Sequence, residues 1–240
     1  MSELEKEIIS VADLLTTKSL TLPDYQRPYK WTLKNVVQLF HDIDTHRDKT
    51  AYRLGTIVFH SDEKKGELNI VDGQQRTLTL LLAVWALMSV IQEGKKKLVR
   101  GELIRQVDDL QNDVENLLQK QSFASTISHK NLRDNFLEIK RIVNRPDFTE
   151  QHIDFLLNSC QVVTFTLVNI SEAFQFFDSQ NARGKDLAPH DLLKAYHLRE
   201  FPDDEQELKS SSVSGWEGLE SEQLETLFAE HVMESDPKKP

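Results

Sequence analysis

The spacing of apolar residues predicts that the first part of the chain contains two helices separated by an extended segment. Residues 3–16 have a helical pattern. Residues 19–31 contain Pro23 and Pro28, which disfavour helix at and before their positions, so this segment is predicted to be a loop or an edge strand. Thr32 is a predicted helix N-cap. The helix behind it is expected to bury one apolar face, made by Leu33, Val36, Val37, Phe40 and Ile43.

The following segment has the pattern of a β-hairpin that leads into a buried helix. Residues 52–60 and 68–72 are strand-like, and the polar residues 62–67 between them form the predicted turn. Residues 77–91 are apolar on nearly every face of a helix, which indicates burial on several sides. This run is shorter than the ~20 residues that a membrane span requires. We therefore expect it to be the central helix of the fold.

More helices and one strand are predicted in the remainder of the chain up to residue 200. Asp147 is expected to start a helix with Glu150 in a capping box. Residues 161–169 have the β-branched alternation of a strand, and helices are predicted from Ser171 and over residues 188–198. Two amphipathic helices are predicted before Asp147, from the spacing of Leu103, Ile104, Val107, Leu110, Val114, Leu117 and Leu118, and of Leu132, Phe136, Ile139 and Val143.

The composition is that of a globular protein in a reducing compartment. Hydrophobic residues make up 39% and charged residues 28% of the 240 residues, enough to build a sizeable core. The single cysteine, Cys160, cannot form an internal disulfide. The N-terminus is acidic and lacks the basic and apolar regions of a signal peptide. We therefore expect a cytoplasmic protein with no membrane partner.

The net charge of −10 is unevenly distributed along the chain. Residues 201–240 hold eleven acidic residues against three lysines, so residues 1–200 are nearly neutral. Global charge gives no support for nucleic-acid binding. A local basic cluster is either a binding face or a solvated helix end, and the second interpretation is favoured. This cluster consists of Lys95, Lys96, Lys97 and Arg100.

The segment IVDGQQRTLTL places a polar cluster between the second predicted strand and the buried helix. The first N–H groups of a helix lack partners and its dipole is positive there, so residues from Gly73 to Arg76 are expected to form an anion site. Gly73 would allow a positive φ, and Arg76 could bind phosphate oxygens bidentately. Gln74 and Gln75 could orient a ligand oxygen or a water, and Asp72 could hold Mg²⁺.

A purely structural role for the same cluster is an equally supported alternative. Asp72 would only cap the helix, and Arg76 would pair with Asp72 locally.

Two further segments carry polar residues of the kind that bind nucleotides. In the first, Tyr25, Tyr29 and Trp31 alternate with Arg27 and Lys30, which suits base stacking and phosphate binding, although anchoring of an edge segment is the favoured alternative. The second surrounds Gly184, for which a helix C-cap followed by a new helix is the alternative. Its polar residues are Asn181, Arg183, Lys185, Asp186, Asp191 and Lys194.

Other chemistry finds no candidate in the sequence. The chain has no G-x-x-x-x-G-K-[ST] loop, no G-x-S-x-G elbow and no paired C-x-x-C. Its eight histidines form no recognisable metal-nuclease cluster. His41, Asp42, Asp44 and His46 fall on the polar face of a predicted helix, where a solvated surface is favoured over a metal site.

Three motifs in order give the chain a specific resemblance. PDYQRPYKW, then LGTIVFH with IVDGQQRTLTLLLA, then FDSQNARGKDLAPHDLLKA resemble the N-terminal domain of the GmrSD-type (type IV) restriction proteins, the DGQQR family, over roughly residues 10 to 200. The resemblance implies an α+β fold similar to ParB/sulfiredoxin, with a small mixed sheet, a buried central helix and surrounding helices. It also implies NTP binding and hydrolysis with a divalent cation, in defence against phage or modified DNA.

The resemblance assigns expected roles residue by residue. The catalytic set is Asp72, Gln74, Gln75 and Arg76, with Asp72 as the Mg²⁺ ligand. The nucleotide-binding set is Tyr25, Gln26, Arg27, Gly73, Arg76, Asn181, Arg183, Gly184 and Lys194. Ala188 departs from the family, whose members often have Ser or Thr there.

We therefore expect two regions. Residues 1–200 form the DGQQR domain, with a helical insertion at about residues 96–160, and residues 201–240 form an acidic linker and the start of a truncated or absent C-terminal helical region. The chain carries no HNH-type nuclease motif, which leaves three alternatives: it is a fragment, it works with a separate HNH-type nuclease domain or subunit, or it works without one. Nucleotide is the expected partner, and DNA is a further candidate. The main alternative is a non-catalytic nucleotide-switch or DNA/partner-binding module, and a third is a scaffold whose polar clusters are structural caps.

Overall fold

The computed structural model describes residues 4–21, 28–119, 126–169 and 173. The chain divides into two compact units, the first comprising Met1–Leu22 and Tyr29–Phe177, the second Pro23–Pro28 and Asp178–Pro240. Nearly all described residues belong to the first unit, and the elements below are its elements. The predicted helices from Ser171 onward and the predicted acidic linker lie outside the described residues.

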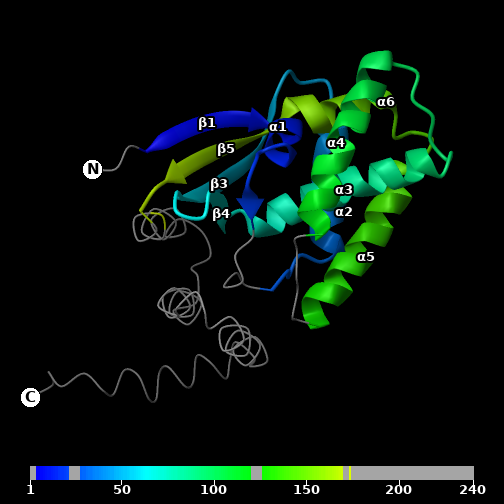
Figure 1. Cartoon of the computed structure of the whole chain (residues 1–240). Coiled ribbons are helices and arrows are strands. Elements are labelled where there is room, and N and C mark those ends of the chain that lie inside the picture. Colours follow the sequence, from blue (N-terminus) through cyan, green and yellow to red (C-terminus); the bar gives the residue numbers. More distant parts are fainter. Residues whose placement is uncertain (1–3, 22–27, 120–125, 170–172, 174–240) are drawn as a thin grey trace, which may run out of the picture. The chain divides into compact units, whose positions relative to one another are not determined.

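A five-stranded mixed sheet with the strand order β1-β5-β3-β4-β2 forms one part of the first unit (Figure 1). β5 pairs antiparallel with β1 and parallel with β3, and β4 pairs antiparallel with β3 and parallel with β2. The strands are β1 (Glu5–Ser10), β2 (Leu20–Thr21), β3 (Tyr52–Asp62), β4 (Glu67–Asp72) and β5 (Cys160–Leu167). The predicted hairpin is confirmed as β3 and β4, and the predicted late strand as β5.

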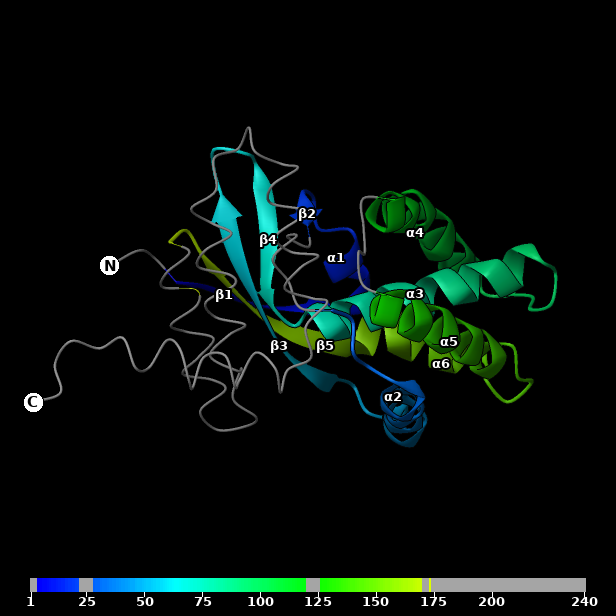
Figure 2. The same cartoon turned by 90° about the horizontal axis from the view of Figure 1, so that it is seen from below.

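Six α-helices are found among the described residues, and α3 continues from the end of β4 to lie between α4 and α5 (Figure 2). α5 also packs on α2, and α1 packs on α4 and on the π-helical turn η1. The helices are α1 (Val11–Leu15), α2 (Leu33–His46), α3 (Gln74–Gln92), α4 (Gly101–Gln119), α5 (Thr126–Val143) and α6 (Glu150–Asp154), which continues into η1 (Phe155–Ser159).

α3 is the central helix that its sequence predicts. Fourteen of its nineteen residues are buried, from Gln74 at its start to Val90 near its end. By length and composition α3 could cross a membrane, but 78% of its apolar window is buried inside the protein. Side chains from the sheet and from α1, α2, α4 and α5 share one apolar core with it. The α+β fold with a mixed sheet and a buried central helix is thereby confirmed.

Three of the local predictions are wrong. Residues 3–16 are not one helix: Glu5–Ser10 pairs with β5, and Ser10 with Asp13 forms the capping box that starts α1. Leu33 and Val37 are about half exposed on α2 instead of buried. α6 starts behind Thr149 rather than Asp147, because the Thr149 side chain and His152 form the capping box.

Candidate functional site

The turn between β4 and α3 has the backbone conformation that its glycine predicts. Gly73 has φ +91° and occupies the N-cap position, so Asp72 is not the cap residue. A Cβ at Gly73 would lie 2.8 Å from Ile57 Cγ1 and 3.2 Å from the Thr56 carbonyl oxygen, both on β3. The position therefore requires glycine for its dihedral angle and for its space.

Arg76 lies against the backbone of β3 from the first turn of α3. Its Nη1 donates a hydrogen bond of 2.8 Å to the Thr56 carbonyl oxygen. A Cβ at Gly55 would lie 2.8 Å from Arg76 Cζ, so the guanidinium rests on a residue that has no side chain. Gly55 has φ +124°, where the pairing of β3 with β5 shifts register. A glycine inside a strand-like run is the one signal in the sequence for this close approach, which was not predicted.

Burial shapes the electrostatics of Arg76. Removal of water lowers the pKa of the Arg76 guanidinium, and the negative charge of Asp72 acts in the opposite direction. Arginine nevertheless keeps its proton in proteins. The turn therefore presents a permanent, partly desolvated cation beside a helix N-terminus, an arrangement that favours an anion.

Gln74 and Gln75, although adjacent, differ in what their side chains contact. Gln75 Oε1 accepts hydrogen bonds from the backbone N–H of Lys30 (2.7 Å) and of Trp31 (3.1 Å). Both lone pairs of that oxygen are therefore used to hold residues 30–31. Gln74 is only 6% exposed, and its Oε1 accepts no hydrogen bond from any described residue. A buried acceptor without a donor is unusual enough to point to a missing water or ligand.

Tyr29 anchors the extended segment instead of offering a surface for stacking. Its side chain is fully buried, and burial raises the pKa of its hydroxyl. The hydroxyl lies 2.7 Å from Thr79 Oγ1 and accepts a hydrogen bond of 2.9 Å from Asn135 Nδ2. For Tyr29 the anchoring interpretation is correct. Asn135, which sequence reasoning missed, carried no signal because an isolated asparagine inside an amphipathic helix has none.

The structure brings together one of the predicted polar segments and part of another. Residues 72–76 and 29–31 meet through Gln75. The remaining predicted site residues lie outside the described part of the chain: Tyr25, Gln26, Arg27, Asn181, Arg183, Gly184, Lys185, Asp186, Asp191 and Lys194.

Asp72 can contribute one carboxylate to the expected Mg²⁺ site. Among the described residues no group of three or more His, Cys, Asp or Glu side chains is placed to hold a metal. Mg²⁺ in phosphate sites commonly uses one or two carboxylates, with waters and phosphate oxygens as the other ligands. A single carboxylate at the end of β4 suits an ion that a nucleotide would bring with it.

The basic cluster at residues 95–100 is largely engaged with its own surroundings. Lys95 forms an ion pair of 2.6 Å with Glu93, and Arg100 one of 2.7 Å with Asp154. Lys96 donates to the Phe148 carbonyl oxygen at 2.6 Å. Two of the four cations are therefore ion-paired and a third is bonded to the backbone, which favours the interpretation as a helix end over a basic binding face.

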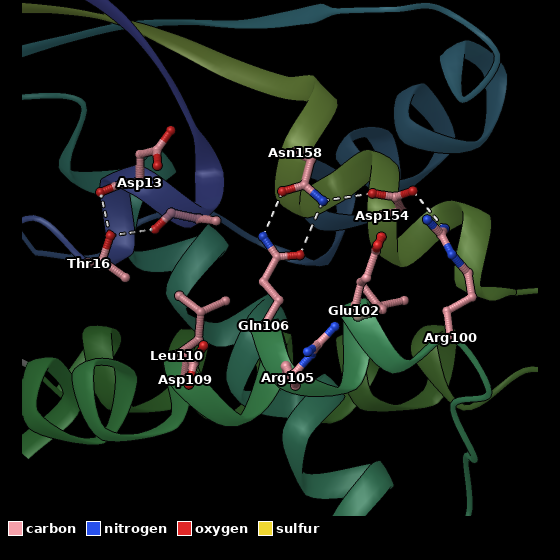
Figure 3. A pocket seen from close by; sticks show the side chains of 12 residues that line it. Asp13, Thr16, Arg100, Glu102, Arg105, Gln106, Asp109, Leu110, Asp154 and Asn158 are labelled. Carbon is pink, nitrogen blue, oxygen red and sulfur yellow. Dashed lines mark hydrogen bonds and ion pairs between the residues drawn. The ribbon is translucent and has the colours of Figure 1, made fainter.

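A hollow of about 580 Å³ lies between α1, α4 and the α6–η1 segment, and none of residues 72–76 lines it (Figure 3). Gln106 and Asn158 exchange two hydrogen bonds across it, of 2.6 and 3.1 Å. Asp154 accepts from Asn158 at 2.7 Å and from Arg100 at 2.7 Å. Four of the polar side chains that line the hollow therefore bond to one another across the helices.

The comparison with known families agrees with the motifs and with the fold. The family model described as GmrSD restriction endonuclease, N-terminal domain, matches residues 11–198, well over half of the chain. No curated protein matches the chain. The chain therefore belongs to the GmrSD restriction endonuclease N-terminal domain family, and with it to the restriction systems that defend against phage.

Proposed function

We propose that the β4–α3 turn binds the phosphates of a nucleoside triphosphate, that the domain hydrolyses it, and that turnover regulates DNA restriction. The observation that carries the proposal is the position of Arg76. It is held on the β3 backbone beside the N-terminus of a nineteen-residue helix whose N-cap is glycine. A fixed cation and a helix N-terminus together make an anion site.

The guanidinium of Arg76 has donors left for a phosphate. Arginine carries five N–H donors, and Nη1 uses one of them on Thr56. No other described residue accepts a hydrogen bond from Arg76. Its attachment to β3 fixes the direction of the fork before the ligand arrives, which reduces the entropy lost on binding.

Gln74 is the residue best suited to the hydrolytic step. Its buried Oε1 has an unused lone pair, and an attacking water supplies the O–H donor that this atom lacks. Orienting the water in line with the γ-phosphate is a recurrent role of glutamine in phosphoryl transfer. Gln75 is less suited, because its Oε1 is engaged with residues 30–31.

Mg²⁺, when bound with the nucleotide, would neutralise phosphate charge, with Asp72 as its protein ligand. The Asp72 carboxylate ends β4 immediately before the turn. Asp72 would supply a carboxylate oxygen to the ion, and Arg76 would bind the phosphates.

A nucleotide switch without turnover is the second candidate. The observation that favours it is the use of Gln75 as a structural clamp, which leaves one glutamine of the motif for chemistry. A switch needs only different nucleotide affinities in two conformations. Binding without phosphate release would select it.

The test measures binding and phosphate release for ATP, GTP, CTP and UTP with Mg²⁺. We expect Arg76→Ala to weaken binding roughly 10- to 100-fold, because a hydrogen bond to a charged group contributes about 1.5–3 kcal/mol. Gln74→Ala and Asp72→Ala should lose turnover more than binding. Arg105→Ala, which removes an exposed arginine of α4, is the matched control. Unchanged affinity in a folded Arg76→Ala protein would exclude the site.

A further inference from the structure

Residues 29–31 are held between two helices that are far apart in the sequence. From α5, Ser128 Oγ accepts from the Tyr29 backbone N–H at 2.8 Å, and Asn131 Nδ2 donates to the Tyr29 carbonyl at 3.1 Å. From α3, Gln75 accepts from the next two N–H groups. α3 and α5 also pack against each other (Figure 2). The segment is therefore fixed at its backbone from both sides.

Asn135 is the centre of the contacts from α5. Its side chain is fully buried, and Nδ2 donates both to the Tyr29 hydroxyl at 2.9 Å and to the Trp31 carbonyl at 2.8 Å. Both N–H donors of the amide are thus in use. The amide oxygen accepts no hydrogen bond from any described residue. This unmet buried acceptor costs stability, which the two hydrogen bonds donated by the same amide offset.

The hydroxyl groups form a directed chain from α5 to the first turn of α3. Thr79 Oγ1 donates to the Gln75 carbonyl at 2.8 Å, so its own proton is used there. The Tyr29 hydroxyl must then donate to Thr79 Oγ1, while it accepts from Asn135 Nδ2. The order is Asn135 to Tyr29 to Thr79 to Gln75. Hydrogen bonds aligned in this way strengthen one another.

Two hydrogen-bonded paths connect Asn135 to Gln75. The hydroxyl chain ends on the Gln75 main-chain carbonyl, and the Trp31 backbone connects Asn135 to the Gln75 side chain. Gln75 is the residue between Gln74 and Arg76 in the proposed phosphate site. The position of Gln75 therefore fixes the direction in which the side chains of Gln74 and Arg76 project from α3.

We propose that Asn135 is a positioning residue for nucleotide binding. It acts on the β4–α3 turn, residues 72–76, through Tyr29, Trp31 and Gln75. The helix α5, which lies in the predicted insertion of residues 96–160, is then part of the functional unit. By linkage, a bound nucleotide then stabilises the contacts of α5 with residues 29–31. The inference rests on the proposed nucleotide site.

The experiment compares Asn135→Leu with Ile139→Ala in the full chain. Leucine keeps the volume and removes the hydrogen bonds, whereas Ile139, one turn further along α5, is fully buried and apolar. Three quantities are measured. The first is the affinity, in the presence of Mg²⁺, for whichever of ATP, GTP, CTP and UTP binds most tightly. The others are Tm and the hydrogen-exchange rates of the Lys30 and Trp31 backbone amides. Asn135→Leu should weaken binding about 2- to 30-fold and speed exchange of both amides.

Ile139→Ala should lower Tm and leave affinity and amide exchange near their original values. Equal affinity for Asn135→Leu and the original chain would overturn the inference, as would equal weakening by Ile139→Ala. If Asn135→Leu does not fold, Tyr29→Phe removes only the central hydroxyl of the chain and should weaken binding in the same direction. Failure of the original chain to bind any of the four nucleotides would instead overturn the proposed function, and this inference with it.

Discussion

The β4–α3 turn and the hollow between α1, α4 and α6–η1 are both polar, yet they differ in how their polar groups are satisfied. In the hollow, Gln106, Asn158, Asp154 and Arg100 bond to one another (Figure 3). In the turn, a buried oxygen of Gln74 and most of the Arg76 fork have no described partner. We place the candidate site at the turn, because buried donors and acceptors without partners indicate a ligand more directly than the volume of a depression does.

Gly73→Ala should have the largest effect on either region. The new Cβ would approach Ile57 Cγ1 to 2.8 Å in a left-handed backbone. We expect the free energy of unfolding to fall by about 2–6 kcal/mol, because backbone strain and overpacking each cost roughly 1–3 kcal/mol. Denaturant unfolding measures this. Gly66→Ala is the control, since its φ is +65° but nothing lies within 4 Å, and it should cost only about 1–2 kcal/mol.

Gly55→Ala should test whether nucleotide affinity depends on the position of Arg76 against β3. The added methyl group meets the Arg76 guanidinium, which is flexible enough to move away. We expect nucleotide affinity to fall roughly 10- to 100-fold, as for loss of the arginine itself. Tm should fall further than in Gly94→Ala, because the φ of +124° at Gly55 is more strained for a side chain than the φ of +68° at Gly94. Wild-type affinity in Gly55→Ala would mean that the position of Arg76 on β3 has no importance for the site.

Asn158→Ala should show that the hollow has no part in nucleotide binding. The variant loses its hydrogen bonds to Gln106 and Asp154 on an exposed surface. Stability should fall by at most about 1 kcal/mol, and nucleotide affinity and turnover should not change. A strong loss of affinity would instead make the hollow part of the nucleotide site.

The smallest effect concerns pH and the end of α3. Hydrogen bonds from Lys140, Lys95 and Ser89 lower the pKa of Glu93 from 4.5 to about 2. A carboxyl group with a lowered pKa stabilises the fold above its unfolded pKa and loses this contribution as pH falls toward the folded value. Thermal unfolding of Glu93→Gln and the original chain should therefore differ most above pH 4.5 and converge near pH 2. A constant difference over this window would exclude the ion pair as the cause.

Local pattern was sufficient for the elements whose causes are local. Gly73 between a strand and a helix predicted the positive φ, and the apolar run behind it predicted the buried α3. Residues 5–10 were misassigned as helix because their partner strand begins at Cys160. The clamp role of Gln75 and the close approach of Gly55 to Arg76 depend on tertiary neighbours that no periodicity reveals. Asn135 was missed for the same reason.

The clamp on residues 29–31 also fixes when during synthesis the site is completed. The bond from Asn135 to Tyr29 joins residues 106 positions apart, whereas the β3–β4 hairpin and the start of α3 are made from neighbouring residues. Chains fold from the N-terminus as they leave the ribosome, and distant contacts form after local ones. A nascent chain therefore carries the DGQQR turn well before α5 emerges to lock it. Under the proposed function, nucleotide binding at full affinity is expected only after most of the domain has been translated.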